Sequence, residues 1–134
     1  MFCEKKIPLC SNNHLIFMSG IITENFGDLS LIDIIYTRPT EESVVLVLVT
    51  SGYVDGSAET QNNLLDKMEG YLRHIQSDEF KQEYASNKVF IEVDFSEEPD
   101  VLITDLLAKC ESWCEENGAT LIVRINNELV SFVK

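Results

Sequence analysis

Two spacings of apolar residues follow each other along this chain, and they divide it into strands and helices. Residues 31–37 are rich in β-branched side chains and end at the turn signal Arg38-Pro39, which predicts a strand. Residues 44–49 are apolar at every position, as in a strand that is buried on both faces of a sheet. The short polar connection between these two stretches predicts a β-hairpin.

Helical spacing occurs twice. Apolar residues recur on one face from Leu64 to Ile75, and Ser77-Asp78 can begin a further short turn. A second apolar stripe runs from Leu102 to Cys114, after the acidic residues 97–100 and before Gly118, a residue suited to end a helix. Both segments predict amphipathic helices with one buried face.

The remaining strands are predicted from alternation. Residues 88–95 alternate between an apolar face and a face with Glu92 and Asp94, and residues 120–133 form a hairpin around Asn126-Asn127. The order from residue 31 is therefore ββαβαββ, after an irregular N-terminal segment. It predicts an α+β fold, a two-layer α/β sandwich in which a mixed or antiparallel sheet carries two helices on one face. Residues 1–30 are expected to form an N-terminal extension or a peripheral strand, and residues 31–134 a single α/β domain.

Charge narrows the choice of partners. The chain has 134 residues, of which 23 are acidic and 10 basic, and a formal net charge of −13. Nucleic acid and anionic membranes are disfavoured, because both require clustered Lys and Arg. A cationic partner is favoured instead; the alternative is that acidity only keeps the protein soluble. The apolar run 15–22 is too short to cross a bilayer and no cleavage signal follows it, so we expect a cytoplasmic protein.

Few residues in the sequence suggest metal binding or catalysis. Cys110 and Cys114 lie on the second apolar stripe, where core packing is expected; a metal site shared with Cys3 and Cys10 is the alternative. Local signatures of catalysis do not occur in the sequence, which predicts neither an enzyme nor a cofactor. The opposing hypothesis is an acidic metal-binding enzyme, in which Asp33, Asp55 and Asp94 hold a divalent cation.

Acidic residues are densest between residues 92 and 116, where Lys109 is the single base. Phe90, Glu92 and Asp94 share the strand face that points away from the apolar stripe, which predicts an exposed surface of carboxylates around an aromatic anchor. An ordinary solvated face is the alternative. With the loop before the first helix, the predicted partner-binding residues are Tyr53, Asp55, Phe90, Glu92, Asp94, Glu97, Glu98 and Asp100.

The helix signature Leu65, Lys67, Tyr71, Leu72 and Ile75, together with the strands around residues 32–34, 45–49 and 89–93, resembles a family of small bacterial domains of unknown function. The resemblance covers roughly residues 31–123 and implies no activity. It implies an aromatic and acidic loop before the helix; Tyr53 and Asp55 occupy this loop, with Tyr in place of the expected Trp. In general character the chain is also similar to immunity proteins of bacterial toxin systems.

These observations predict a protein-binding module, specifically an immunity protein that binds and blocks a cationic bacterial toxin domain such as a toxin nuclease domain. The first alternative is a structural or regulatory domain that forms a homodimer through the final hairpin or the second helix. The second is the acidic metal-binding enzyme.

Overall fold

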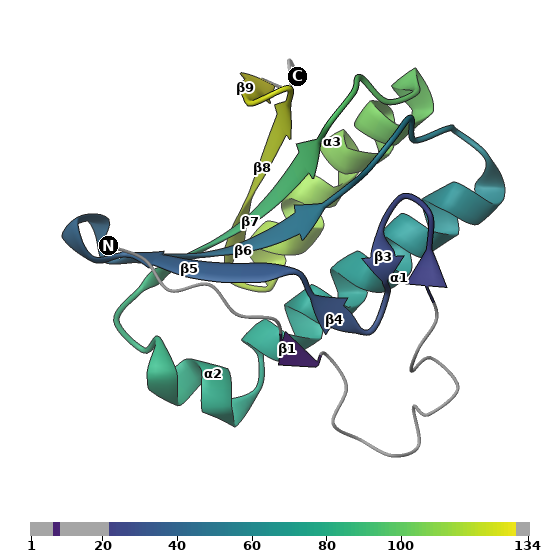
Figure 1. Ribbon diagram of the computed structural model, residues 1–134. Helices are drawn as coiled ribbons and strands as arrows, with labels where there is room; N and C mark the ends of the chain where they lie inside the picture. Colours follow the sequence, from purple (N-terminus) through teal and green to yellow (C-terminus); the bar gives the residue numbers. More distant parts are fainter. Residues whose placement is uncertain (1–6, 9–21, 131–134) are drawn as a thin grey trace.

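The structure is a computed structural model that describes residues 7–8 and 22–130, and in this part of the chain the main feature is a five-stranded mixed sheet (Figure 1). The principal elements are β5 (Ile34–Arg38), β6 (Ser43–Val49), α1 (Ala58–Ile75), α2 (Asp78–Glu83), β7 (Lys88–Phe95), α3 (Val101–Glu116), β8 (Ala119–Ile125) and β9 (Glu128–Val130). Two short ladders precede them: β1 (Ile7–Pro8) pairs with β4 (Leu31–Ile32), and β2 (Ile22–Thr23) pairs with β3 (Gly27–Asp28). A 3-10 turn, η2 (Pro39–Glu41), joins β5 to β6.

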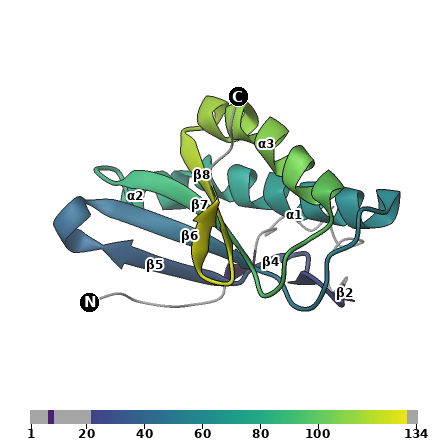
Figure 2. The same cartoon turned by 90° about the horizontal axis from the view of Figure 1, so that it is seen from above.

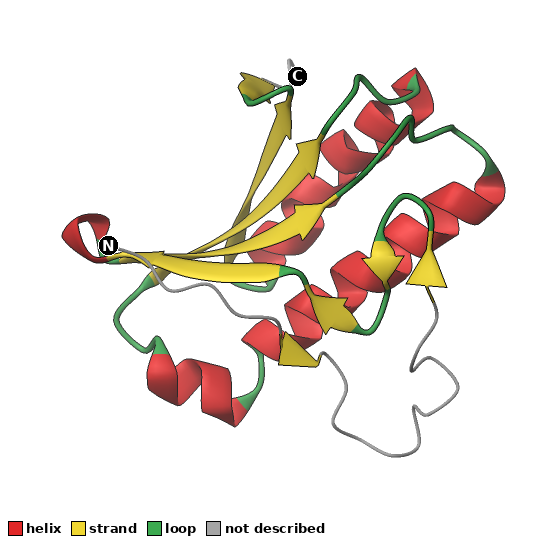
Figure 3. Cartoon of the chain, viewed as in Figure 1, coloured by secondary structure: helices red, strands yellow, loops and turns green. Residues whose placement is uncertain are grey.

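Strand order in the main sheet follows chain order, β5-β6-β7-β8-β9. β6, β7 and β8 are parallel, and each edge strand forms an antiparallel hairpin with its neighbour. Parallel neighbours need crossover connections, and these are right-handed, so sequential strand order brings α1 and α3 to the same face of the sheet. Figures 2 and 3 show both long helices on that face. The predicted α+β fold with a mixed sheet is confirmed, as are both predicted hairpins.

The core lies between the helices and the sheet. Every second residue of β6, namely Val44, Leu46 and Leu48, is completely buried in this core. α3 contributes Cys110 and Cys114, both free thiols, and burial raises their pKa to about 11 and about 12. The predicted core role of these two cysteines is confirmed, whereas Cys3 and Cys10 lie outside the described residues.

The structure departs from the predicted element bounds at Asp33, where the strand predicted over residues 31–37 divides into β4 and β5. The Asp33 carboxylate accepts a hydrogen bond from Val49 N and binds Lys67, so the chain is diverted towards these partners. Phe26 and Leu29 precede the predicted domain boundary at residue 30, yet both are buried in the core. Of the apolar run 15–22, only Ile22 lies within the described residues, and it belongs to β2. None of the helices in the described residues is long and apolar enough to cross a membrane.

Candidate functional site

The face of the sheet opposite the helices carries three of the predicted partner-binding residues. Glu92 lies on the central strand β7 between Val47 and Ile122, with Arg124 Nε 3.4 Å from its Oε1 atom. Its exposed fraction is only 6%, so the expectation of an exposed carboxylate at Glu92 is wrong.

Asp94 and Phe90 flank Glu92 on the same face and are partly buried. Burial, assisted by the adjacent Glu92 carboxylate and opposed by Arg124, raises the pKa of Asp94 to about 7. Glu92 Oε1 and Asp94 Oδ1 are both inaccessible, and neither has a hydrogen-bond partner in the described part of the chain. These residues therefore form a packed surface with a basic neighbour rather than the solvated acidic surface that was predicted.

The other predicted residues meet at the carboxyl ends of the parallel strands. The β6–α1 loop and the β7–α3 loop leave the sheet at this same edge, where ligands of α/β sheets commonly bind. Tyr53 donates its hydroxyl hydrogen to Asp100 Oδ2 over 3.2 Å, and Asp100 N donates to Val54 O over 2.9 Å. A Cβ atom at Gly56 would lie 2.8 Å from Asp100 Oδ1 and 2.9 Å from Leu102 Cδ1, so a larger residue at this position would have to displace these side chains.

Exposed apolar side chains surround this contact. Tyr53 is 52% exposed, Val101 65% and Leu102 50%. The expected burial of Leu102 on the second apolar stripe is wrong, and Val101 was not singled out from the sequence. Three consecutive apolar residues at a helix start are more than one face can bury, and Ile103 is the one that reaches the core. We call the following set the Tyr53 patch: Tyr53, Asp55, Glu97, Glu98, Asp100, Val101 and Leu102.

All charged residues of the Tyr53 patch are acidic. Neither residues 39–66 nor residues 89–108, which include both loops, contain a Lys or Arg. Asp55 has a lowered pKa because the Thr60 hydroxyl and the Ser57 backbone N–H donate hydrogen bonds to it. The pKa of Tyr53 is raised by partial desolvation, by its hydrogen bond to Asp100 and by the charge of Asp55. Ionised carboxylates thus border an apolar centre.

Asp33, Asp55 and Asp94 do not form the divalent-cation site of the enzyme hypothesis. Asp33 is paired with Lys67, and Asp55 accepts hydrogen bonds at the start of α1. Across the described residues, no three His, Cys, Asp or Glu side chains are arranged to hold a metal ion.

The helix signature has a structural explanation in a buried polar cluster. Lys67 is completely buried, and its Nζ atom lies 2.9 Å from Asp33 Oδ1 and 2.5 Å from Phe26 O. Tyr71 donates to Val47 O over 2.8 Å and accepts from Asp33 N over 3.0 Å. The signal was present in the sequence, because Lys67 lies three residues after Leu64 and four before Tyr71, on the buried stripe.

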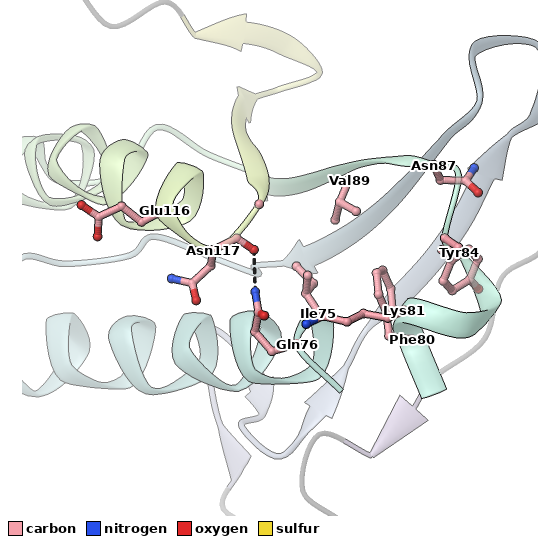
Figure 4. Close-up of a pocket in the computed structure, with 11 residues that line it drawn as sticks. Ile75, Gln76, Phe80, Lys81, Tyr84, Asn87, Val89, Glu116 and Asn117 are labelled. Atoms are coloured by element: carbon pink, nitrogen blue, oxygen red, sulfur yellow. Dashed lines mark hydrogen bonds between the residues drawn. The ribbon is translucent and has the colours of Figure 1, made fainter. Parts of the chain in front are cut away.

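A pocket of about 450 Å³ opens at the opposite end of the sheet, between the ends of α1 and α3 and the short helix α2 (Figure 4). Gln76 Nε2 donates to Asn117 O over 2.8 Å across its mouth. Ile75, Phe80 and Val89 line its apolar side. One base, Lys81, and one acid, Glu116, also line it, so the pocket has no net charge preference and we do not place the functional site there.

A family described as a family of unknown function, DUF6572, matches residues 25–127 of the chain. The match begins at Asn25, in the turn between β2 and β3, and includes the helices and the strands β5 to β8 of the main sheet; β9 lies after its end. No curated protein and no solved structure matches the chain.

Proposed function

Because the chain belongs to DUF6572, a family of unknown function, we propose from its site alone that the protein binds a basic protein partner through the Tyr53 patch. The observation that carries this proposal is the exposure of Tyr53, Val101 and Leu102 within segments that contain acids and no bases. Aromatic and aliphatic side chains at the centre of an interface supply most of its binding energy, and charges at the rim select and attract the partner.

The partner we propose is a cationic bacterial toxin domain, such as a nuclease, whose basic active site the Tyr53 patch covers. A nuclease active site must attract phosphate and is therefore positively charged, and the net charge of −13 on this chain accelerates association with such a surface. In this proposal the protein acts in the cytoplasm as an immunity protein.

The test uses two matched charge reversals on loops and helix ends. The double variant Glu97→Lys/Glu98→Lys alters the patch, and Glu115→Lys/Glu116→Lys alters exposed acids at the far end of α3 with the same change in net charge. Both are compared with the wild type for affinity to the product of the adjacent gene, at low and at physiological ionic strength. A third variant, Tyr53→Ala, probes the apolar centre.

We expect the patch variant to lose at least tenfold in affinity and most of the salt dependence, while the control at residues 115–116 stays within about threefold of the wild type. Tyr53→Ala should increase the dissociation rate more than it lowers the association rate. Equal losses in both double variants would mean that only total charge matters. A basic partner that binds the wild type and all variants alike would contradict the proposal.

A second candidate function, self-association, is favoured by β9. In the described residues this short strand is an edge of the sheet, and Leu129 on it is 65% exposed. Edge strands pair readily with a second copy. Light scattering of the wild type and of Leu129→Lys separates this candidate from the first: a dimer that dissociates on substitution supports it, and a monomeric wild type rejects it.

A further inference from the structure

The turn between β2 and β3, residues 24–26, is hydrogen-bonded to the loop that carries Tyr53. Ser51 N donates to Asn25 O over 2.9 Å, and Ser51 Oγ donates to Glu24 O over 2.8 Å. In the other direction, Asn25 Nδ2 donates to Ser51 O over 2.9 Å and to Tyr53 O over 3.0 Å. Both amide hydrogens of Asn25 are therefore used on carbonyls of the loop, one on each side of Gly52.

The conformation that these bonds hold is unusual for a free loop. Gly52 has a φ of 70°, in the left-handed region, and its N–H donates to Ser96 Oγ over 3.2 Å. The carbonyl groups of Ser51 and Tyr53, on either side of Gly52, both accept from the Asn25 amide. They can do so together only while the backbone at Gly52 keeps this conformation. The Asn25 amide thus sets the path of the chain immediately before Tyr53.

Packing fixes the two ends of this segment, at the buried residues Thr50 and Val54, but not the residues between them. Ser51 and Tyr53 are exposed, and a groove of about 360 Å³ opens beside the contact, lined among others by Asn25, Ser51 and Val49. Tyr53 is half exposed and meets the β7–α3 loop through its hydroxyl. Its position therefore depends on how its backbone is held, since no enclosing core fixes the ring.

The turn is also held by a buried charge, the ammonium group of Lys67. Lys67 Nζ binds Phe26 O, the carbonyl next to Asn25 in the chain, and the same ammonium is paired with Asp33. Phe26 is 1% exposed and belongs to the core. A continuous set of contacts consequently links Lys67 on α1, the Phe26 carbonyl, the Asn25 amide and Tyr53.

We propose that Asn25 is the positioning residue of the Tyr53 patch, and that Lys67 fixes the turn from which Asn25 acts. This inference rests on the proposed function for its significance, because a preordered loop binds a partner without the cost of ordering it on contact. Asn25 does not touch the partner in this view; it acts through Tyr53.

The experiment compares Asn25→Ala with Asn87→Ala, a matched substitution immediately before β7, at the opposite end of the strands. Three quantities are measured on the free protein: the urea midpoint, amide hydrogen exchange of residues 51–55, and the titration of Tyr53 followed by NMR of ¹³C-labelled tyrosine rings. The Tyr53 titration is the decisive readout, because a loss of global stability does not change the environment of this hydroxyl in the folded state.

In Asn25→Ala we expect exchange at residues 51–55 to accelerate at least tenfold and the Tyr53 titration midpoint to fall towards that of free tyrosine, as the bond to Asp100 is lost. Asn87→Ala should show neither change. Lys67→Met should reproduce both changes if it folds, and Asn25→Ala decides the question if it does not. Unchanged exchange and an unchanged Tyr53 midpoint in Asn25→Ala would overturn the inference.

A failure of the proposed function would be distinguishable from a failure of this inference. If the wild type does not bind the product of the adjacent gene, the interaction proposal fails, while the exchange and titration results still decide whether Asn25 positions Tyr53. If the wild type binds and Asn25→Ala binds equally tightly, Asn25 does not position Tyr53 for the partner, and the interaction proposal stands without it.

Discussion

Replacement of Asp94 by Asn should stabilise the protein at alkaline pH and have a smaller effect in mild acid. The folded state raises the pKa of Asp94 from 3.8 to about 7, because the carboxyl group is withdrawn from water beside Glu92. Between these two values the native protein holds a proton that the unfolded chain has released, so stability falls as pH rises from about 4 to about 7 and is then constant with respect to this group. Asn resembles the protonated carboxyl group and does not incur this loss.

The size of the effect follows from the shift. A difference of about 3 pKa units corresponds to about 4 kcal/mol at about 1.36 kcal/mol per unit. Asp94 is only partly buried, and solvent screening reduces this to about 1–2 kcal/mol. About half of the remainder develops between about pH 5.5 and pH 8, so the Asn variant should gain on the wild type by about 0.5–1 kcal/mol over this interval.

Urea unfolding followed by the fluorescence of Trp113, the one Trp in the chain, measures the difference at both pH values. Asp105→Asn, at an exposed position on α3, is the control for the loss of one negative charge. If the stability difference between Asp94→Asn and the wild type is the same at both pH values, the carboxyl group is not perturbed and the reasoning about the Glu92–Asp94 pair is wrong.

Three further outcomes are expected. Lys67→Met should destabilise the fold by about 3–5 kcal/mol because it leaves the Asp33 carboxylate without its partner, and adding Asp33→Asn should restore about half of the loss, as measured by urea unfolding. Asp100→Ala removes the side chain that accepts from Leu102 N at the start of α3 and should cost about 1 kcal/mol in the same assay. Cys110 and Cys114 should resist iodoacetamide at pH 8 in the native protein, because burial raises the pKa of both thiols, and should react after unfolding. Mass spectrometry of peptides resolves the two sites. Labelling of the native protein would contradict their burial.

The fold could be predicted largely because its hydrophobic periods are unambiguous. The apolar run of β6, the helical stripe of α1 and the alternation of β7 each specify one element and one buried face. Strand order could not be predicted, because the periods do not say which strands become neighbours. Asp33 was assigned to a continuous strand because its partner Lys67 lies 34 residues away.

The candidate site was predicted in part. The β6–α1 and β7–α3 loops follow parallel strands, so Tyr53, Asp55 and Asp100 do meet, although the sequence does not reveal that the strands are parallel. The expected exposure of Glu92 was wrong because alternation identifies the face of a residue and not how deeply its neighbours cover it. Asn25 was missed because its importance comes from a tertiary contact across 26 and 28 residues.

The order of the strands also has a consequence for how the chain assembles. The two outer hairpins join neighbouring stretches, whereas the inner pairs bring together positions as distant as Ser43 and Lys88. Closing such long segments is slow compared with forming a tight turn. If the β5–β6 hairpin forms before α1 and β7 have packed, the apolar run of β6 has one free edge and two uncovered faces, which are features that promote aggregation.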